Sequence, residues 1–133
     1  MLRLTTAQRD SIVATCVRAL PDEGCGVLIG DESGVVSEVV ASPNVAASAR
    51  IYEVDSRVLL RAHRDAETRG LLVIGSFHSH THSAAEPSPT DVAQAFDPAW
   101  HYVLVSLAEL PTVVRSFRIV DGAVEEESVS VDA

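Results

Sequence analysis

Apolar side chains recur with a helical period near the start of the chain, which predicts an amphipathic helix. The stripe contains Ile12, Val13, Cys16, Val17 and Leu20. Thr5 or Thr6 can cap this helix, and Gln8 is placed for a capping box with Thr5. Pro21 cannot continue a helix, so we expect the helix to end there.

Two further helices are predicted. The second has an apolar stripe on Val58, Leu59, Ala62 and Ala66. Asp55 can cap its start, and Gly70 is suited to ending it. A third helix is expected to begin in the run Ser-Pro-Thr-Asp at residues 88–91, with Ser88 as the cap and Pro89 in the first helical position.

Short apolar or alternating runs between turn residues predict strands at 25–29, 35–40, 50–54, 71–77 and 101–107. A hairpin is expected from 112–120 and 123–131 around Asp121-Gly122, with a frayed tail after it. The run 71–77 is the most apolar and is predicted to be central. These elements predict a single α/β domain over residues 1–133, with a mixed sheet and about three helices.

Composition excludes several classes of protein. Nineteen acidic against ten basic residues give a net charge of −9, which argues against nucleic-acid binding. No apolar run reaches the length of about 18 residues that a membrane span needs. The N-terminal residues do not resemble a secretory signal, so a cytoplasmic location is expected. Cys16 and Cys25 are too few for a disulfide framework and are interpreted as buried thiols.

The chemistry is concentrated in residues 78–91, which read H-S-H-T-H-S-A-A-E-P-S-P-T-D. Side chains two positions apart on a strand share a face, so His78 and His80 can project from the end of the predicted central strand in one direction. The following loop can return Asp91 to them on the first turn of the next helix. A catalytic zinc site keeps three protein ligands and one open position. His78, His80 and Asp91 could form such a set.

Purely structural interpretations of these residues remain open at this point. An H-x-H pair by itself is common, and Ser88 with Asp91 could be a capping box and nothing more. His82 could lie on the rim of a pocket or act as an alternative ligand. His63, among charged residues in the predicted second helix, is expected to be solvated, and His101 is expected to be structural.

The spacing H-S-H, seven residues, then S-x-x-D resembles the signature of the JAMM metalloprotease family, also called the MPN+ domain. Glu23 matches the glutamate that the family carries upstream, in a segment that resembles the family's E-x-C-G run. The stretches 101–106 and 115–122 look most like the small bacterial branch. That branch includes peptidases that release cysteine from a ubiquitin-like sulfur-carrier protein.

The resemblance implies a cytidine-deaminase-like architecture and one Zn²⁺ held by His78, His80 and Asp91. It implies that Glu23 is the general base and acid, and that Ser88 stabilises the oxyanion. The competing acids are Glu32, Glu53 and Glu86. Cys25 is interpreted as packing near the site and not as a nucleophile.

The expected substrate is the amide or isopeptide bond after the Gly-Gly tail of a ubiquitin-like or sulfur-carrier protein, and a carrier–cysteine adduct is preferred. The alternatives are a deconjugating isopeptidase acting on lysine and a catalytically silent MPN scaffold. A structural metal site closed by His82 is a further possibility. Zinc deaminases, which need H-x-E and P-C-x-x-C, and metallo-β-lactamase-type hydrolases, which need H-x-H-x-D-H, do not fit the motifs.

Overall fold

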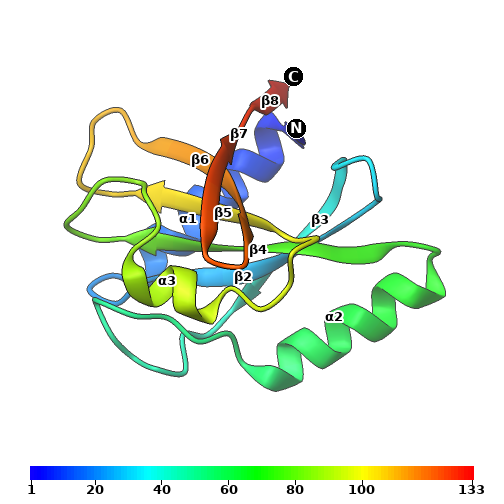
Figure 1. Cartoon of the computed structure of the whole chain (residues 1–133), viewed down its shortest axis with the longest axis horizontal. Coiled ribbons are helices and arrows are strands. Elements are labelled where there is room, and N and C mark those ends of the chain that lie inside the picture. Colours follow the sequence, from blue (N-terminus) through cyan, green and yellow to red (C-terminus); the bar gives the residue numbers. More distant parts are fainter.

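The computed structural model describes all 133 residues and contains three helices around a six-stranded mixed sheet (Figure 1). The strand order is β3-β2-β4-β5-β6-β7. These strands are β2 Cys25–Gly30, β3 Val36–Ser42, β4 Leu72–His80, β5 His101–Ser106, β6 Val113–Val120 and β7 Ala123–Glu127. β4 and β5 run parallel, and the other neighbours are antiparallel. The α/β class and the mixed sheet are confirmed.

The two faces of the sheet are covered by different helices. α1 (Thr6–Ala19) packs on one face, where Ile12 and Cys16 join a core with Val103 of β5. α2 (Ser56–Thr68) covers the other, where Ala62 and Ala66 meet a second core. Burial on both sides explains why β2, β4 and β5 are almost continuously buried.

The predicted helix starts are confirmed. Thr5 and Gln8 form the capping box of α1, and Asp55 caps α2. Gly70 follows the end of α2 at a φ of +68°, a conformation that glycine adopts without strain. The buried stripe of α1 is shorter than predicted, because Val17 and Leu20 are about half exposed. No helix is long and apolar enough to span a membrane.

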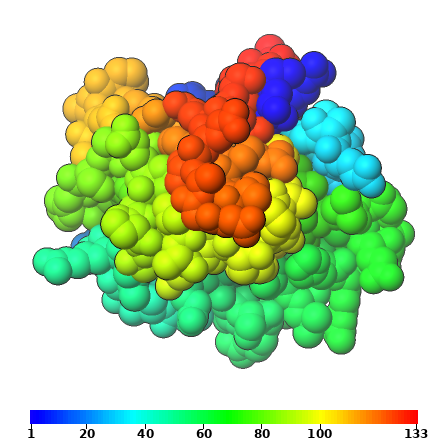
Figure 2. Space-filling model, in the orientation of Figure 1, coloured from blue at the N-terminus to red at the C-terminus, as the bar shows by residue number.

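Two predicted elements are wrong. Residues 50–54 form a loop with a single bridge from Val54 to Asn44, because the backbone there is held by side-chain hydrogen bonds instead of a strand ladder. The tail does not fray: β8 (Val129–Asp132) leaves the hairpin and pairs in parallel with β1 (Leu2–Thr5). Figure 2 shows the two ends of the chain side by side on the surface.

The central strand is longer than predicted and carries both histidines of the motif. β4 ends at His80, so His82 lies beyond the strand, as expected. Around this end of β4 the loops 43–55, 81–88 and 107–112 gather together with α3 (Pro89–Gln94) (Figure 1). The sheet therefore presents one end of its most buried strand to a cluster of loops.

Candidate metal centre

Three side chains converge at this end of the sheet. Nε2 of His78 lies 3.1 Å from Oδ2 of Asp91, and Nε2 of His80 lies 3.0 Å from the same oxygen. All three residues are buried, and their candidate ligand atoms lie within 4.8 Å of one another. Ligands on a tetrahedral ion with bonds of about 2.0 Å are separated by about 3.3 Å. The spacing therefore suits a small divalent cation.

The hydrogen bonding of His80 also suits a metal ligand. Its Nδ1 lies 2.8 Å from the carbonyl oxygen of Ala84, which can only accept, so Nδ1 carries the proton. In the neutral ring Nε2 then directs a lone pair at the Asp91 carboxylate. Burial lowers the pKa of His80, but its hydrogen bonds to Asp91 and Ala84 outweigh this and raise it, so without a metal a proton lies between Nε2 and the carboxylate, and a bound cation would take the place of that proton.

The reactive nitrogen of His78 lies close to Asp91 Oδ2, but the angles of this contact are not those of a hydrogen bond. Nε2 is one of three buried side-chain atoms in the chain that lack a partner. Burial lowers the pKa of His78, which favours the neutral ring that metals bind. Tyr52 stacks on this ring, with centroids 4.0 Å apart and planes 15° from parallel. The stacking limits rotation of the ring. Tyr52 follows from no motif, because it lies in an irregular loop far from His78 in sequence.

Asp91 completes the set from the first turn of α3. Its carboxylate accepts the Ser88 N–H at 2.9 Å, while its own N–H donates to Ser88 Oγ at 3.1 Å. The predicted capping box is therefore present. Burial by itself would raise the pKa of Asp91, but the two imidazoles beside it outweigh this and hold the pKa well below its usual range. The carboxylate is thus an anion, as a ligand must be.

Glu23 enters the site through the pairing of β2 with β4. Cys25 is opposite His78, and one step earlier Gly24 N–H donates to Ser79 Oγ at 2.8 Å while Ser79 N–H donates to the Gly24 carbonyl at 3.0 Å. Ser79, the middle residue of H-S-H, points away from the two histidines and fixes the segment that bears Glu23. The carboxylate is therefore placed by a long-range strand pairing.

The environment of Glu23 suits a proton carrier. The side chain is buried, and its Oε1 has no hydrogen-bond partner. Burial raises the pKa of Glu23 to about 7, although the nearby His80 opposes the shift and Asp91 adds to it. A general base works best when its pKa lies near the working pH.

The competing acids lie elsewhere. Glu32 is in the turn before β3, Glu53 is an exposed loop residue, and Glu86 is exposed and contacts Arg115. None is buried with the three converging side chains. Cys25 is fully buried, and burial raises the pKa of its thiol to about 12, which disfavours the nucleophilic thiolate.

A cavity of about 550 Å³ opens onto the site. Glu23, His80 and Ser88 line it together with Ala49, Arg50 and residues 81–83. His82 is exposed on its rim and its Nδ1 lies 2.8 Å from Thr81 Oγ1, so its ring is not one of the three converging groups. The cavity gives a substrate access to Glu23 and Ser88.

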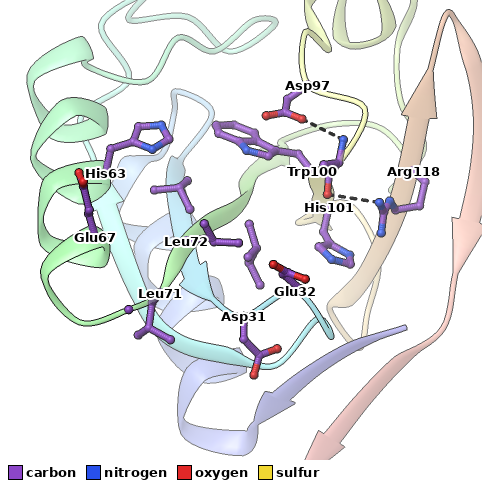
Figure 3. Close-up of a pocket in the computed structure, with 14 residues that line it drawn as sticks. Asp31, Glu32, His63, Glu67, Leu71, Leu72, Asp97, Trp100, His101 and Arg118 are labelled. Carbon is purple, nitrogen blue, oxygen red and sulfur yellow. Dashed lines mark hydrogen bonds between the residues drawn. The ribbon is translucent and has the colours of Figure 1, made fainter.

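A larger cavity, about 800 Å³, lies at the opposite end of β4 and contains none of these groups. Figure 3 shows it between the end of α2, with His63 and Glu67, and the residues Trp100 and Arg118. His63 is exposed there, as expected, and His101 is buried against Glu127 at 2.6 Å. The cavity that matters for the chemistry is the smaller one.

Comparison with known proteins identifies the family. A model of the prokaryotic homologs of the JAB domain, Prok-JAB, matches residues 5–120. The chain belongs to this family. The JAMM resemblance of residues 78–91 is thereby confirmed.

Two relatives of this Prok-JAB protein have named activities. It is 42% identical over 124 residues to the CysO-cysteine peptidase of Mycobacterium tuberculosis, covering 92% of this chain and 85% of that one. It is 34% identical over 111 residues to a desampylase of Haloferax volcanii, covering 79% of this chain and 80% of that one.

Solved structures share the fold. The solution structure of DSY2949 from Desulfitobacterium hafniense matches with a TM-score of 0.91 and 36% identity, covering 99% of this chain and 93% of that one. AF2198, a JAB1/MPN domain protein from Archaeoglobus fulgidus, matches with a TM-score of 0.65 and 17% identity, covering 100% and 98%. The predicted JAMM/MPN architecture is confirmed.

Proposed function

We propose that this Prok-JAB protein is a zinc peptidase that hydrolyses the amide bond after the Gly-Gly tail of a ubiquitin-like sulfur-carrier protein and releases cysteine. The observation that carries the proposal is the buried convergence of His78, His80 and Asp91 beside an unpartnered Glu23 carboxylate. The peptidase activity named for the 42% identical relative supports it. Release of cysteine from a carrier would place the protein in cysteine synthesis, in the cytoplasm.

His78, His80 and Asp91 would hold one Zn²⁺, a borderline-soft ion for which two imidazoles and a carboxylate are a usual ligand set. When bound, zinc would lower the pKa of a water molecule and polarise the carbonyl that this water attacks. Ala84 and Ser88 would keep the ligands oriented, through His80 Nδ1 and the Asp91 carboxylate respectively.

Glu23 would accept the proton of the attacking water and deliver it to the leaving amine. Its carboxylate lines the cavity, and its raised pKa makes both transfers feasible near neutral pH. Ser88 Oγ already accepts the Asp91 N–H, which leaves its hydroxyl proton free. That proton would be donated to the oxyanion that forms when the carbonyl is attacked.

The access route suits a glycine tail. Ala49 and Thr81 form one continuous stretch of the cavity wall, because Thr81 Oγ1 donates to the Ala49 carbonyl at 3.3 Å. Glycines have no side chains and fit a channel too narrow for other residues. The loop that forms this wall has small side chains next to Arg50, since residues 46–49 are Ala-Ala-Ser-Ala.

A second candidate function is deconjugation of a ubiquitin-like modifier from lysine. The 34% identical relative that is named a desampylase supports this second function. A silent scaffold is disfavoured, because both histidines, Asp91 and Glu23 are all present and converge.

The test is incubation of the zinc-loaded protein with a carrier-Gly-Gly–cysteine adduct, followed by mass spectrometry. We expect wild type to release cysteine and Glu23→Gln to leave the adduct intact while keeping its zinc. Glu53→Gln, an exposed loop glutamate outside the cavity, is the matched control and should cleave like wild type. An intact adduct after incubation with zinc-loaded wild type would refute the proposal.

A further inference from the structure

The cavity at the site contains one fixed positive charge. All ten basic residues of the chain are arginines, and Arg50 is the one among them that lines this cavity. Arg57, Arg69 and Arg115 are each in contact with carboxylates. The guanidinium of Arg50 has no hydrogen-bond or ion-pair partner within the chain, so it is free to bind an anion.

The backbone on both sides of Arg50 is held in place. Arg50 N–H donates to Ser48 Oγ at 3.0 Å, and the carbonyl of the next residue, Ile51, accepts from Asn44 Nδ2 at 3.0 Å. On the preceding side the Ala49 carbonyl accepts from Thr81 Oγ1 at 3.3 Å, just after the strand that bears the histidines. The side chain of Arg50 therefore starts from a fixed point on the cavity wall.

The same loop is tied to the general base. Glu23 N–H donates to the Ser48 carbonyl at 2.8 Å, and Asn44 Nδ2 donates to the Glu23 carbonyl at 3.0 Å. Asn44 Oδ1 also accepts from the N–H groups of Ala46 and Glu53. Arg50 and Glu23 thus belong to one hydrogen-bonded unit, and a group held by Arg50 is positioned relative to the carboxylate that protonates the leaving amine.

We propose that Arg50 determines specificity by binding the free α-carboxylate of the leaving amino acid. This rests on the peptidase function proposed above. In an adduct linked through the α-amine, the carboxylate is one carbon away from the nitrogen that departs, so it must lie in the same cavity as the scissile bond. A guanidinium matches a carboxylate with two parallel hydrogen bonds.

The charge of Glu23 favours a cationic partner for this carboxylate. The cavity wall includes the Glu23 carboxylate, which repels a second anion placed near the scissile nitrogen. An isopeptide on lysine has a methylene chain at that place and brings no carboxylate. The proposed substrate class is therefore a carrier-Gly-Gly adduct of an amino acid with a free α-carboxylate, and the inferred contact does not involve the thiol of cysteine.

The test compares two adducts that differ in one group, carrier-Gly-Gly–cysteine and carrier-Gly-Gly–cysteine amide. We expect zinc-loaded wild type to prefer the carboxylate by about 10- to 100-fold in kcat/KM, the range for a lost hydrogen bond to a charged group. Arg50→Ala should bring the ratio close to one, mainly through slower cleavage of the carboxylate substrate, and Arg50→Lys should keep part of the preference. Arg64→Ala, an exposed and unpaired arginine on α2, should keep all of it.

Equal cleavage of both adducts by wild type, or an unchanged ratio in Arg50→Ala, would overturn the inference. If wild type cleaves neither adduct, the peptidase proposal fails, and calorimetric binding of both adducts then decides about Arg50. Tighter binding of the carboxylate form that is lost in Arg50→Ala supports the contact. Equal binding of the two forms would refute the contact between Arg50 and the carboxylate.

Discussion

Burial of Glu23 predicts a pH-dependent loss of stability in the metal-free protein. Burial raises its pKa from 4.5 to about 7, so the folded state keeps a proton that the unfolded state releases. Each pKa unit corresponds to about 1.4 kcal/mol, and a shift of this size therefore costs about 3 kcal/mol once Glu23 is ionised in both states. The stabilising effect of the proton is fully present below pH 4.5 and is lost as the pH rises through about 7.

Glu23→Gln cannot ionise and should not show this loss. Urea unfolding of metal-free wild type and Glu23→Gln at pH 4.5 and pH 8 measures it, because the difference between the two proteins removes the contribution of every group that does not interact with Glu23. We expect the free energy of unfolding of Glu23→Gln, relative to that of wild type, to rise by about 3 kcal/mol from pH 4.5 to pH 8. Glu32→Gln, in an exposed turn, is the control and should run parallel to wild type. A Glu23→Gln difference that is equal at both pH values would refute the argument from burial. Added zinc should shrink the effect, since a nearby dication favours the ionised carboxylate.

Two further predictions concern the metal set and the oxyanion donor. Inductively coupled plasma mass spectrometry should find about one zinc per chain in wild type and none in His78→Ala. The control His63→Ala, which removes an exposed ring on α2, should keep its zinc. Retained zinc in His78→Ala would contradict the ligand assignment. Ser88→Ala should lower kcat by about 10²-fold with zinc content unchanged, whereas Ser88→Thr keeps a hydroxyl and should stay close to wild type. Full activity in Ser88→Ala would assign Ser88 to capping alone.

The convergence of His78, His80 and Asp91 could be predicted because its geometry is local. His78 and His80 share a face through strand alternation, and Asp91 stands three residues after a helix cap; both patterns depend only on spacing. Glu23 is different. Its position depends on the pairing of β2 with β4, next to the contact of Gly24 with Ser79, 55 residues away, and only the family resemblance indicates it.

The remaining parts of the site lie in the loop that was wrongly predicted as a strand. The run Arg50 to Val54 is predicted as a strand, but Asn44 binds its backbone with side-chain hydrogen bonds, and a single bridge from Val54 to Asn44 takes the place of a ladder. Tyr52 and Arg50 take their positions from this network, so no periodicity indicates them. The parallel pairing of β1 with β8 was missed because it joins opposite ends of the chain.

The capping box and the proposed active site are one arrangement and do not compete as explanations. Ser88 N–H holds the Asp91 carboxylate in the direction of both imidazoles, and Asp91 N–H holds Ser88 Oγ beside the cavity. Each residue is fixed by the backbone of the other, so neither has to be ordered when a substrate binds. Groups that are already oriented need little reorganisation in the transition state, which is the main source of electrostatic catalysis. In the proposed mechanism the spacing S-x-x-D therefore has a structural reason and a catalytic consequence in the same two hydrogen bonds.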